Sequence, residues 1–224
     1  MMALLEVKNL KKEFRRNGKS FFAVDGVGLS LDKGVFASVM GESGSGKSTL
    51  LNLIAGLLLP TSGEVLIDGT NLSLLNDSDL SAFRNSSVGH IPQGLSLLAN
   101  LNALDNIRLP FFLSKRKGDP SSEARKLLRL LGIEGLALSY PSDLSGGEAK
   151  RAAIARALIN KPALILADEP TENLDADIAK EIVSLFKTVS KEGTAVLMVT
   201  HDERAAAEAD CRYFMKGGRL FNGK

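Results

Sequence analysis

The chain has one cysteine and no tryptophan among its 224 residues, and aromatic side chains make up only 5% of it. A single cysteine excludes an internal disulfide and fits a reducing compartment, and we expect Cys211 to pack as a small buried apolar residue. The few aromatic residues give little support to a surface that stacks nucleic-acid bases. The net charge of +2 is also too small to favour nucleic acid or an anionic membrane surface as a partner.

Long hydrophobic runs are missing as well. The N-terminus lacks the apolar core of a secretion signal, and the most apolar stretch, Leu50 to Leu59, is interrupted by Asn52 and ends at Pro60. That stretch is far shorter than a membrane-spanning helix. A role at a membrane would therefore be that of a peripheral subunit, and the length fits one domain with a sizeable apolar core.

A glycine-rich loop at residues 41–48 is the most informative motif that the chain contains. It matches the phosphate-binding pattern G-x-x-x-x-G-K-[ST], which predicts a nucleoside triphosphate and Mg²⁺ as ligands. Glycines let the backbone curl so that its N–H groups point inward. We expect Lys47 to reach the β- and γ-phosphates and the Ser48 hydroxyl to hold the metal ion. The predicted nucleotide-binding residues here are Gly41, Glu42, Ser43, Gly44, Ser45, Gly46, Lys47, Ser48 and Thr49.

The neighbouring segments suit such a loop. Residues 35–39 are typical of a buried strand and residues 48–54 of a helix, so the phosphates would lie at a helix N-terminus, where free N–H groups and the helix dipole favour anions. Elsewhere in the first seventy residues we expect strands at 4–10, 21–24, 28–31 and 64–69, with a turn at 60–63.

The second half alternates between helices and strands. Asp119-Pro120 is expected to start a helix that runs through Leu131, and another helix is expected from Ser145 to Ile159. The apolar runs at 163–167 and 195–199 are typical of parallel strands covered on both faces, and an amphipathic helix lies between them. A hairpin is expected about Gly217-Gly218. The pattern predicts an α/β core with a mainly parallel sheet, into which a helical block is inserted.

Two adjacent carboxylates, Asp168 and Glu169, follow the apolar strand at its carboxyl end, where ligand sites lie in open parallel sheets. Asp168 is placed to act on the magnesium shell opposite Ser48. Glu169 could orient or deprotonate a water for attack on the γ-phosphate. Taken alone, Asp-Glu-Pro-Thr could merely end a strand and begin a helix, but the phosphate loop favours the catalytic interpretation.

A second possible anion site begins at Ser145. The sequence Leu144-Ser145-Gly146-Gly147-Glu148 would open a helix with a hydroxyl and exposed backbone N–H groups. A single nucleotide site has no obvious need for two such cradles. Taken alone, this stretch could be nothing more than a helix start.

These motifs occur together, and with a late Thr200-His201-Asp202 the set resembles the ATP-binding subunits of ABC transporters over nearly the whole chain. The resemblance implies a P-loop NTPase core, an N-terminal antiparallel β subdomain and an inserted helical subdomain. It further implies a head-to-tail dimer that binds two ATP molecules with Mg²⁺, in which each phosphate loop faces residues Ser145, Gly146, Gly147 and Glu148 of the other subunit. A homodimer is favoured over a heterodimer.

The resemblance also assigns roles to four residues outside the phosphate loop. Phe14 matches the aromatic residue that stacks on adenine, although ordinary core packing is the alternative. Gln93 matches the glutamine that touches magnesium and the attacking water, and His201 matches the histidine that contacts the γ-phosphate. Asp175 is the best-matched residue of a loop that crosses the dimer interface.

Some positions depart from the family pattern. Ala149 and Lys150 replace glutamines that are common after the signature, Asp143 precedes Leu144 where glutamine is common, and Glu172 occupies a loop position usually held by a small residue. The stretch from Phe83 to Pro110 looks most like the branch that contains lipoprotein-releasing, macrolide-efflux and cell-division ATPases.

The predicted function is that of an ATP-hydrolysing motor subunit, bound on the cytoplasmic face of the membrane to a separate integral-membrane permease and to a second ATP-binding subunit, with no nucleic acid. Residues 1–92 and 160–224 would form the nucleotide-binding core and residues 93–159 the helical signature subdomain. Lys47, Gln93, Glu169 and His201 are the predicted catalytic residues, and Ser48, Gln93 and Asp168 the predicted metal ligands. A permease-free ABC switch and a small-molecule kinase are the alternatives.

Overall fold

The computed structural model describes residues 3–94, 96–114 and 116–223, so residues 95 and 115 of the expected helical insertion lie outside the described residues. Its smaller sheet is antiparallel and has the strand order β2-β1-β4-β5. These strands are β1 (Leu5–Arg16), β2 (Lys19–Leu31), β4 (Ser62–Ile67) and β5 (Thr70–Asn71). The expected antiparallel β subdomain is therefore confirmed, and it also includes two strands that follow the phosphate loop in the sequence.

The first strands differ from the sequence-based expectation in length. The segments 21–24 and 28–31, expected as separate strands, are one strand, and β1 continues six residues past Leu10 to Arg16. Asp25-Gly26 does not turn the chain. The register between β1 and β2 shifts there, from Leu10↔Val27 to Lys12↔Val24, and Gly26 has φ 68°. An extra residue in a left-handed conformation makes a β-bulge, which bends the strand without ending it.

The larger sheet has the order β10-β9-β3-β8-β7-β6. All neighbouring pairs from β9 to β6 are parallel, and only β10 runs antiparallel to β9. This confirms the expected mainly parallel sheet and the hairpin about Gly217-Gly218. The strands are β3 (Phe36–Met40), β6 (Val88–Ile91), β7 (Leu164–Asp168), β8 (Ala195–Val199), β9 (Cys211–Lys216) and β10 (Arg219–Asn222).

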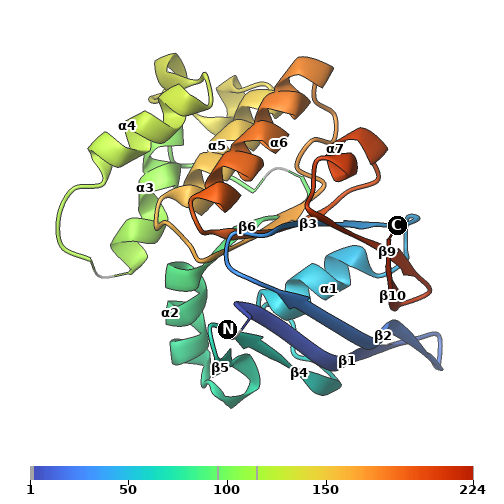
Figure 1. Cartoon of the computed structure of the whole chain (residues 1–224). Helices are drawn as coiled ribbons and strands as arrows, with labels where there is room; N and C mark the ends of the chain where they lie inside the picture. The colour runs from blue at the N-terminus through green and yellow to red at the C-terminus, as the bar shows by residue number, and fades with distance from the viewer. Residues whose placement is uncertain (1–2, 95, 115, 224) are drawn as a thin grey trace.

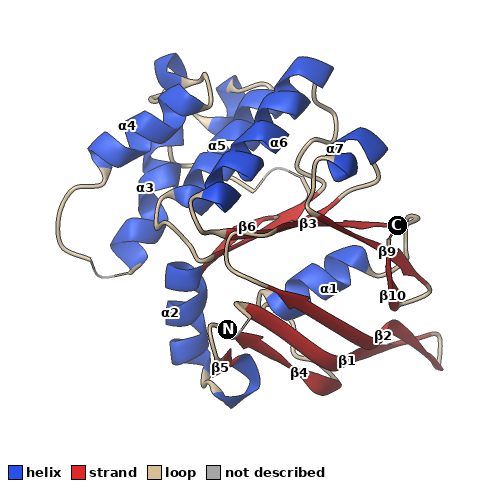
Figure 2. Cartoon of the chain, viewed as in Figure 1, coloured by secondary structure: helices blue, strands red, loops and turns tan. Residues whose placement is uncertain are grey.

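Seven α-helices are present in the part of the chain that the structure describes. They are α1 (Lys47–Ile54), α2 (Asp77–Ser87), α3 (Ala103–Leu113), α4 (Ser121–Leu130), α5 (Gly146–Leu158), α6 (Ala176–Lys191) and α7 (Glu203–Ala207). Helices α3 to α7 lie on one side of the six-stranded sheet, whereas α1 lies between this sheet and the four-stranded sheet (Figures 1 and 2). The molecule thus has a layer of helices, a sheet, a single helix and a second sheet.

Two apolar clusters hold these layers together. Leu50, Leu51 and Ile54 of α1 are fully buried between the two sheets, in one cluster with residues of β1, β3 and β8. On the other face of the six-stranded sheet, Phe36 and Phe186 meet edge to face with ring centroids 6.4 Å apart. Because β3, β7 and β8 are covered on both faces, their residues are apolar without alternation, except for Ser38 in β3 and Asp168 at the end of β7.

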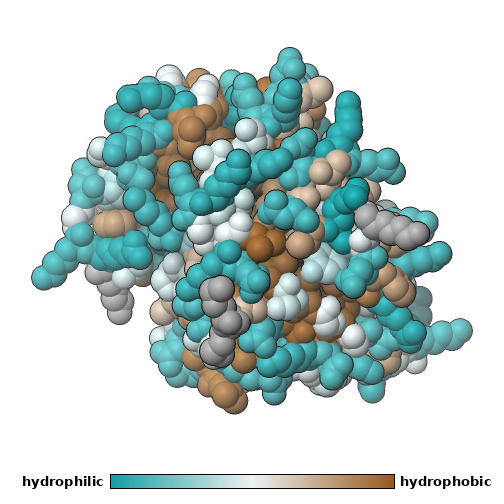
Figure 3. Space-filling view, in the orientation of Figure 1, coloured by the Kyte–Doolittle hydropathy of each residue, from teal (hydrophilic) through white to brown (hydrophobic). Residues whose placement is uncertain are grey.

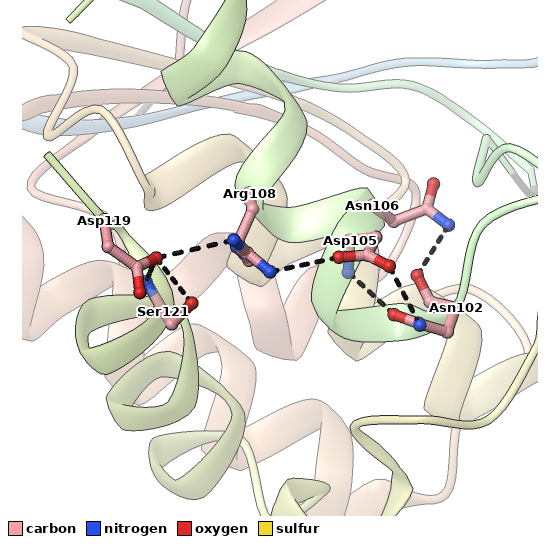
Figure 4. Close-up of polar contacts among 6 residues, drawn as sticks. All are labelled: Asn102, Asp105, Asn106, Arg108, Asp119 and Ser121. Atoms are coloured by element: carbon pink, nitrogen blue, oxygen red, sulfur yellow. Dashed lines mark hydrogen bonds and ion pairs between the residues drawn. The ribbon is translucent and has the colours of Figure 1, made fainter. Parts of the chain in front are cut away.

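Polar contacts fasten α3 to the start of α4, as Figure 4 shows. Arg108 contacts the carboxylates of Asp105 (3.2 Å) and Asp119 (3.4 Å). Asp119 also accepts a hydrogen bond from the backbone N–H of Ser121 at 2.9 Å. The expected N-cap at Asp119 is wrong by one residue: the helix begins at Ser121 with Pro120 at the N-cap position, and Asp119 accepts from Ser121 from just outside the helix.

Helix α2, strand β6 and the burial of Cys211 are among the features that were missed or wrongly expected from the sequence. Helix α2 buries only Leu80, so its hydrophobic periodicity is weak, although Asn76 caps it by accepting from the N–H of Asp79. Strand β6 is only four residues long and contains Gly89, which hides its β pattern. Cys211 is exposed and not buried, because it is the first residue of β9 at the rim of the sheet.

Figure 3 shows a face covered mostly by hydrophilic side chains, with smaller hydrophobic areas between them. Among the described residues, no helix combines the length and apolar character that crossing a membrane requires.

Candidate functional site

The phosphate loop connects the end of β3 to the start of α1, and it is fixed from both sides. The N–H of Gly218, in the turn between β9 and β10, donates to the Ser45 carbonyl at 3.0 Å, and the N–H of Asp25 on β2 donates to the Gly218 carbonyl at 2.8 Å. Gly46 has φ 107°, and a Cβ there would overlap the carbonyl oxygen of Ala23 on β2. The loop shape therefore depends on the hairpin and on β2, which are distant in sequence.

Lys47 is held inside this loop. Its ammonium donates to the carbonyl oxygens of Gly41 (2.8 Å) and Glu42 (3.0 Å), and the side chain is buried. These carbonyls keep the ammonium at the centre of the loop, where anionic phosphate oxygens would be stronger acceptors than neutral carbonyls.

Asp168 ends β7 and is only 6% exposed. Burial raises the pKa of its carboxyl group, while the Ser48 hydroxyl and the Lys47 ammonium oppose that shift. Its Oδ1 atom is buried without a hydrogen-bond partner in the described structure. An unpartnered buried carboxylate oxygen is costly, so this atom is available for a cation or for a water bound to one.

Glu169 follows the strand in a left-handed backbone conformation, with φ 46°. This conformation is uncommon for a residue with a side chain and is often found at functional sites. Its Oε2 atom lies 3.0 Å from Nδ1 of His201 and accepts from the His201 backbone N–H at 3.2 Å. The hydrogen bond to Glu169 raises the pKa of His201. The two side chains thus orient each other across the ends of β7 and β8.

Gln93 lies two residues after β6, at the same edge of the sheet. Its side-chain Nε2 donates to Oε2 of Glu172 at 3.2 Å. Glu172 belongs to the loop between β7 and α6, so this hydrogen bond joins two segments that border the site. Glu172 is unusual at its position in this loop, but its contact with Gln93 was not predicted from the sequence.

Aromatic side chains form one wall. Phe14 of β1 pairs with Phe21 of β2, and their ring centroids lie 6.0 Å apart. Phe14 is half-buried, whereas Phe21 and Phe22 are exposed. Phe14 therefore stands at the edge of the cleft and not inside the core, which leaves part of its ring accessible.

These groups surround a single cleft of about 730 Å³. Of the predicted site residues, its lining includes Phe14, Gly41, Glu42, Ser43, Gly44, Gly46, Lys47, Ser48, Thr49, Gln93, Asp168, Glu169 and His201. Ser45, which also belongs to the loop, is buried. The lining also contains residues that the sequence analysis did not assign to the site, namely Phe21, Phe22, Ala23, Glu172, Gly217 and Gly218. The exposed Phe21-Phe22 pair beside Phe14 is the signal that could have revealed part of this wall.

The remaining predicted residues do not line the cleft. Ser145 caps α5 with a reciprocal pair of bonds: its Oγ accepts from the Glu148 N–H, and Glu148 Oε2 accepts from the Ser145 N–H at 2.7 Å. Ser145 and Gly146 are exposed, and a Cβ on Gly146 would meet nothing within 4 Å. Asp175 is exposed at the N-cap of α6, where its side chain makes no capping bond. The α5 N-terminus is thus open to an outside group.

Comparisons with known proteins agree with this geometry. The family described as ABC transporter matches residues 24–172. The lipoprotein-releasing system ATP-binding protein LolD of Buchnera aphidicola subsp. Schizaphis graminum (strain Sg) is 42% identical over 223 residues, which cover 99% of this chain and 97% of that protein. The protein of the same name from Bordetella avium (strain 197N) is 40% identical, over 100% of this chain and 98% of that protein.

Solved structures are similar at the same level. The dimeric structure of MJ0796, a bacterial ABC transporter cassette, has a TM-score of 0.92 and 36% identity, with 96% of each chain covered. A second dimeric structure of that cassette, in a post-hydrolysis state bound to ADP and Pi, has a TM-score of 0.90 and 36% identity, and covers 97% of this chain and 98% of that one.

Proposed function

Because this chain belongs to the ABC transporter family, as an ATP-binding subunit that hydrolyses ATP, we propose that it works as a homodimer that drives a separate permease in lipoprotein release. The names of its relatives support the cargo, and the dimeric cassette structures support the dimer. Binding to the permease would place it on the cytoplasmic face of the membrane, and no nucleic acid takes part.

One observation gives the main support for the proposed dimer. The cleft gathers the phosphate loop, both carboxylates, Gln93 and His201, whereas the N-terminus of α5 is not part of its lining and is exposed at Ser145 and Gly146. A head-to-tail pair of subunits would bring Ser145, Gly146, Gly147 and Glu148 of one chain to the phosphate loop of the other. Asp175, also exposed, would contact the partner at the same interface. Each subunit alone then contributes half of each ATP site.

The cleft residues divide the chemistry among themselves. Phe14 would stack on adenine, and the backbone N–H groups of the loop would bind the phosphates. Lys47 would exchange its carbonyl partners for β- and γ-phosphate oxygens. Glu169 would accept a proton from the attacking water, and His201 would orient Glu169 and contact the γ-phosphate. Phosphoryl transfer depends mainly on such positioning and charge stabilisation.

The residues also fit a magnesium ion. Ser48 and Asp168 present hard oxygen ligands, one of them the unpartnered buried Oδ1 atom of Asp168, and Gln93 could add its amide oxygen or bind through water. Mg²⁺, when bound with the triphosphate, would neutralise charge that develops on the phosphate oxygens.

Mixing two inactive variants tests the shared site. Gly146→Asp, at an open position, should keep the fold but place a negative charge where phosphate is expected, and Lys47→Ala should remove the cation of the loop. Each variant alone should hydrolyse ATP very slowly. An equimolar mixture should recover about a quarter of the wild-type rate, since half of the dimers would be mixed and each would hold one intact site. A mixture no more active than its components would show that α5 does not complete the partner's site.

We propose that a groove of about 630 Å³ is the binding site for a short helix of the permease. It lies between the core, with Leu57 and Ala82, and the end of α3, with Leu113. Leu57 and Leu113 are exposed, so the groove offers apolar side chains to a partner. We place the core at residues 1–92 and 160–224 and the helical subdomain at 93–159. A helix in this groove would touch both parts, beside Val88 and His90 of β6, and could transmit their relative motion.

Co-purification tests the permease partner. We expect the Glu169→Gln variant, tagged and expressed in its native host, to bring down an integral-membrane protein from detergent-solubilised membranes with ATP and Mg²⁺. Leu113→Glu in the groove should abolish this, whereas Leu130→Glu, an equally exposed leucine on α4, should not. The ATPase activity of the purified subunit should be the same in both leucine variants. Recovery of the protein without a membrane partner, or with nucleic acid, would favour a permease-free switch.

A further inference from the structure

Two departures from the family pattern lie near each other in the fold. Lys150 lies on α5 and Glu172 in the loop between β7 and α6. The start of α5 packs on that loop, because a Cβ on Gly147 would lie 3.2 Å from Cδ2 of Leu174. Lys150 follows Gly147 by three residues and is therefore on the same face of the helix. It is only 6% exposed, so its charged side chain is largely removed from solvent.

The surroundings of Lys150 are strongly acidic. Burial lowers the pKa of its ammonium group, and the carboxylates of Glu172, Asp168 and Glu169 oppose that shift, with Glu172 contributing most. A buried lysine is costly unless opposite charge lies nearby. Conversely, Glu172 adds a third carboxylate to the site, and Lys150 offsets it. The positive charge of Lys150 and the negative charge of Glu172 thus offset each other.

Glu172 uses this position to hold Gln93, through the 3.2 Å hydrogen bond from Nε2 to Oε2. Gln93, Glu172 and the predicted metal ligand Asp168 border the same cleft. A small residue at position 172 could not make such a bond. This contact is therefore a property of this chain, made possible by the glutamate.

We propose that Glu172, balanced by Lys150, is a positioning residue that keeps Gln93 turned toward the loop at residues 171–175 until a nucleotide with Mg²⁺ competes for it. The proposal rests on the proposed role of Gln93 in the magnesium shell. Glu172 then lowers the affinity of the cleft for the magnesium–nucleotide complex. Because Glu172 belongs to the loop that leads to Asp175 and packs on the start of α5, release of Gln93 would also affect these two segments. Binding at the cleft would thereby free the segments that meet the second subunit.

Nucleotide affinity with and without magnesium tests this inference. A fluorescent non-hydrolysable ATP analogue is titrated into wild type, Glu172→Ala and Glu172→Gln, once with Mg²⁺ and once with EDTA. Glu172→Ala should lower Kd with Mg²⁺ by about threefold to tenfold, the size expected for one exposed, charge-assisted hydrogen bond, and should leave Kd in EDTA nearly unchanged. Glu172→Gln keeps an acceptor oxygen for Gln93 and should change Kd less. An equal shift in both conditions, or no shift, would overturn the proposal.

The Gln93→Ala variant tests the premise, that Gln93 belongs to the magnesium shell, separately from the proposed role of Glu172. It should raise Kd only with Mg²⁺ if Gln93 belongs to the magnesium shell. No change would remove that role and the proposed competition with it, whereas a raised Kd together with an unaltered Glu172→Ala variant would refute the competition alone.

The pairing with Lys150 is tested by a double-mutant cycle on Tm. Lys150→Met should be less favourable with Glu172 present than in the Glu172→Gln background, because only then does it leave Glu172 uncompensated. Additive effects would show that Lys150 does not support Glu172.

Discussion

Glu169→Gln is expected to slow ATP hydrolysis by about a hundred- to a thousandfold, within the range that general-base catalysis contributes, while ATP binding persists. Glutamine has nearly the shape of glutamate and can still contact His201, but it cannot accept a proton from the attacking water. Because Glu169 does not hold Lys47 or the loop, the phosphates should still bind. Phosphate release measured at saturating ATP, beside a nucleotide titration, separates the two effects. Longer-lived ATP-bound dimers should appear in size-exclusion chromatography.

The matched control is Glu64→Gln, which neutralises an exposed carboxylate on β4, outside the cleft. Its turnover should equal that of wild type. If Glu169→Gln also hydrolyses ATP at the wild-type rate, Glu169 is not the base.

Gly46→Ala is expected to lower the free energy of unfolding by about 3 to 5 kcal/mol, through an unfavourable backbone conformation and a steric overlap together. Position 46 has φ 107°, and the new Cβ would meet the Ala23 carbonyl on β2 and, at 2.9 Å, Cε of Met215. Methionine can move aside, but the backbone of a paired strand cannot do so without breaking its register. Urea denaturation followed by circular dichroism measures the loss.

Gly44→Ala isolates the contribution of the backbone. Gly44 has φ 78°, yet a Cβ there has no neighbour within 4 Å. Its cost should be only about 1 kcal/mol, the usual penalty of a left-handed conformation. Equal losses in the two variants would mean that contact with β2 does not constrain the loop.

The sequence predicted those parts of the fold in which a local residue pattern indicates a buried strand or a turn. Continuous apolar runs identified β7 and β8, and Gly217-Gly218 identified the hairpin, which has φ 55° and 80° at its turn. Bulges are harder to predict. A sequence such as Asp25-Gly26 can either end a strand or bend it, and which of the two occurs depends on how the neighbouring strand pairs with it. Helix α2 was missed because it packs mainly through Leu80.

Sequence motifs predicted which residues form the site, but not the contacts between them. The family model and the relatives confirm the ABC ATPase assignment, and the structure gathers the phosphate loop, Gln93, Asp168, Glu169 and His201 around one cleft. Their individual roles stay predictions. The Gln93–Glu172 bond and the burial of Lys150 depend on segments far apart in the sequence, so no local pattern contains them.

The hydrogen bond from Gly218 to Ser45 has a consequence for the order of events during synthesis. The phosphate loop is synthesised early, but the hairpin that supports it is synthesised much later, and β9 must then pair with the free edge of β3. Contacts between such distant segments form late in folding. We therefore expect a nascent chain to contain the complete phosphate-binding motif before the loop has its native support, and nucleotide binding to require β9 and β10 in place.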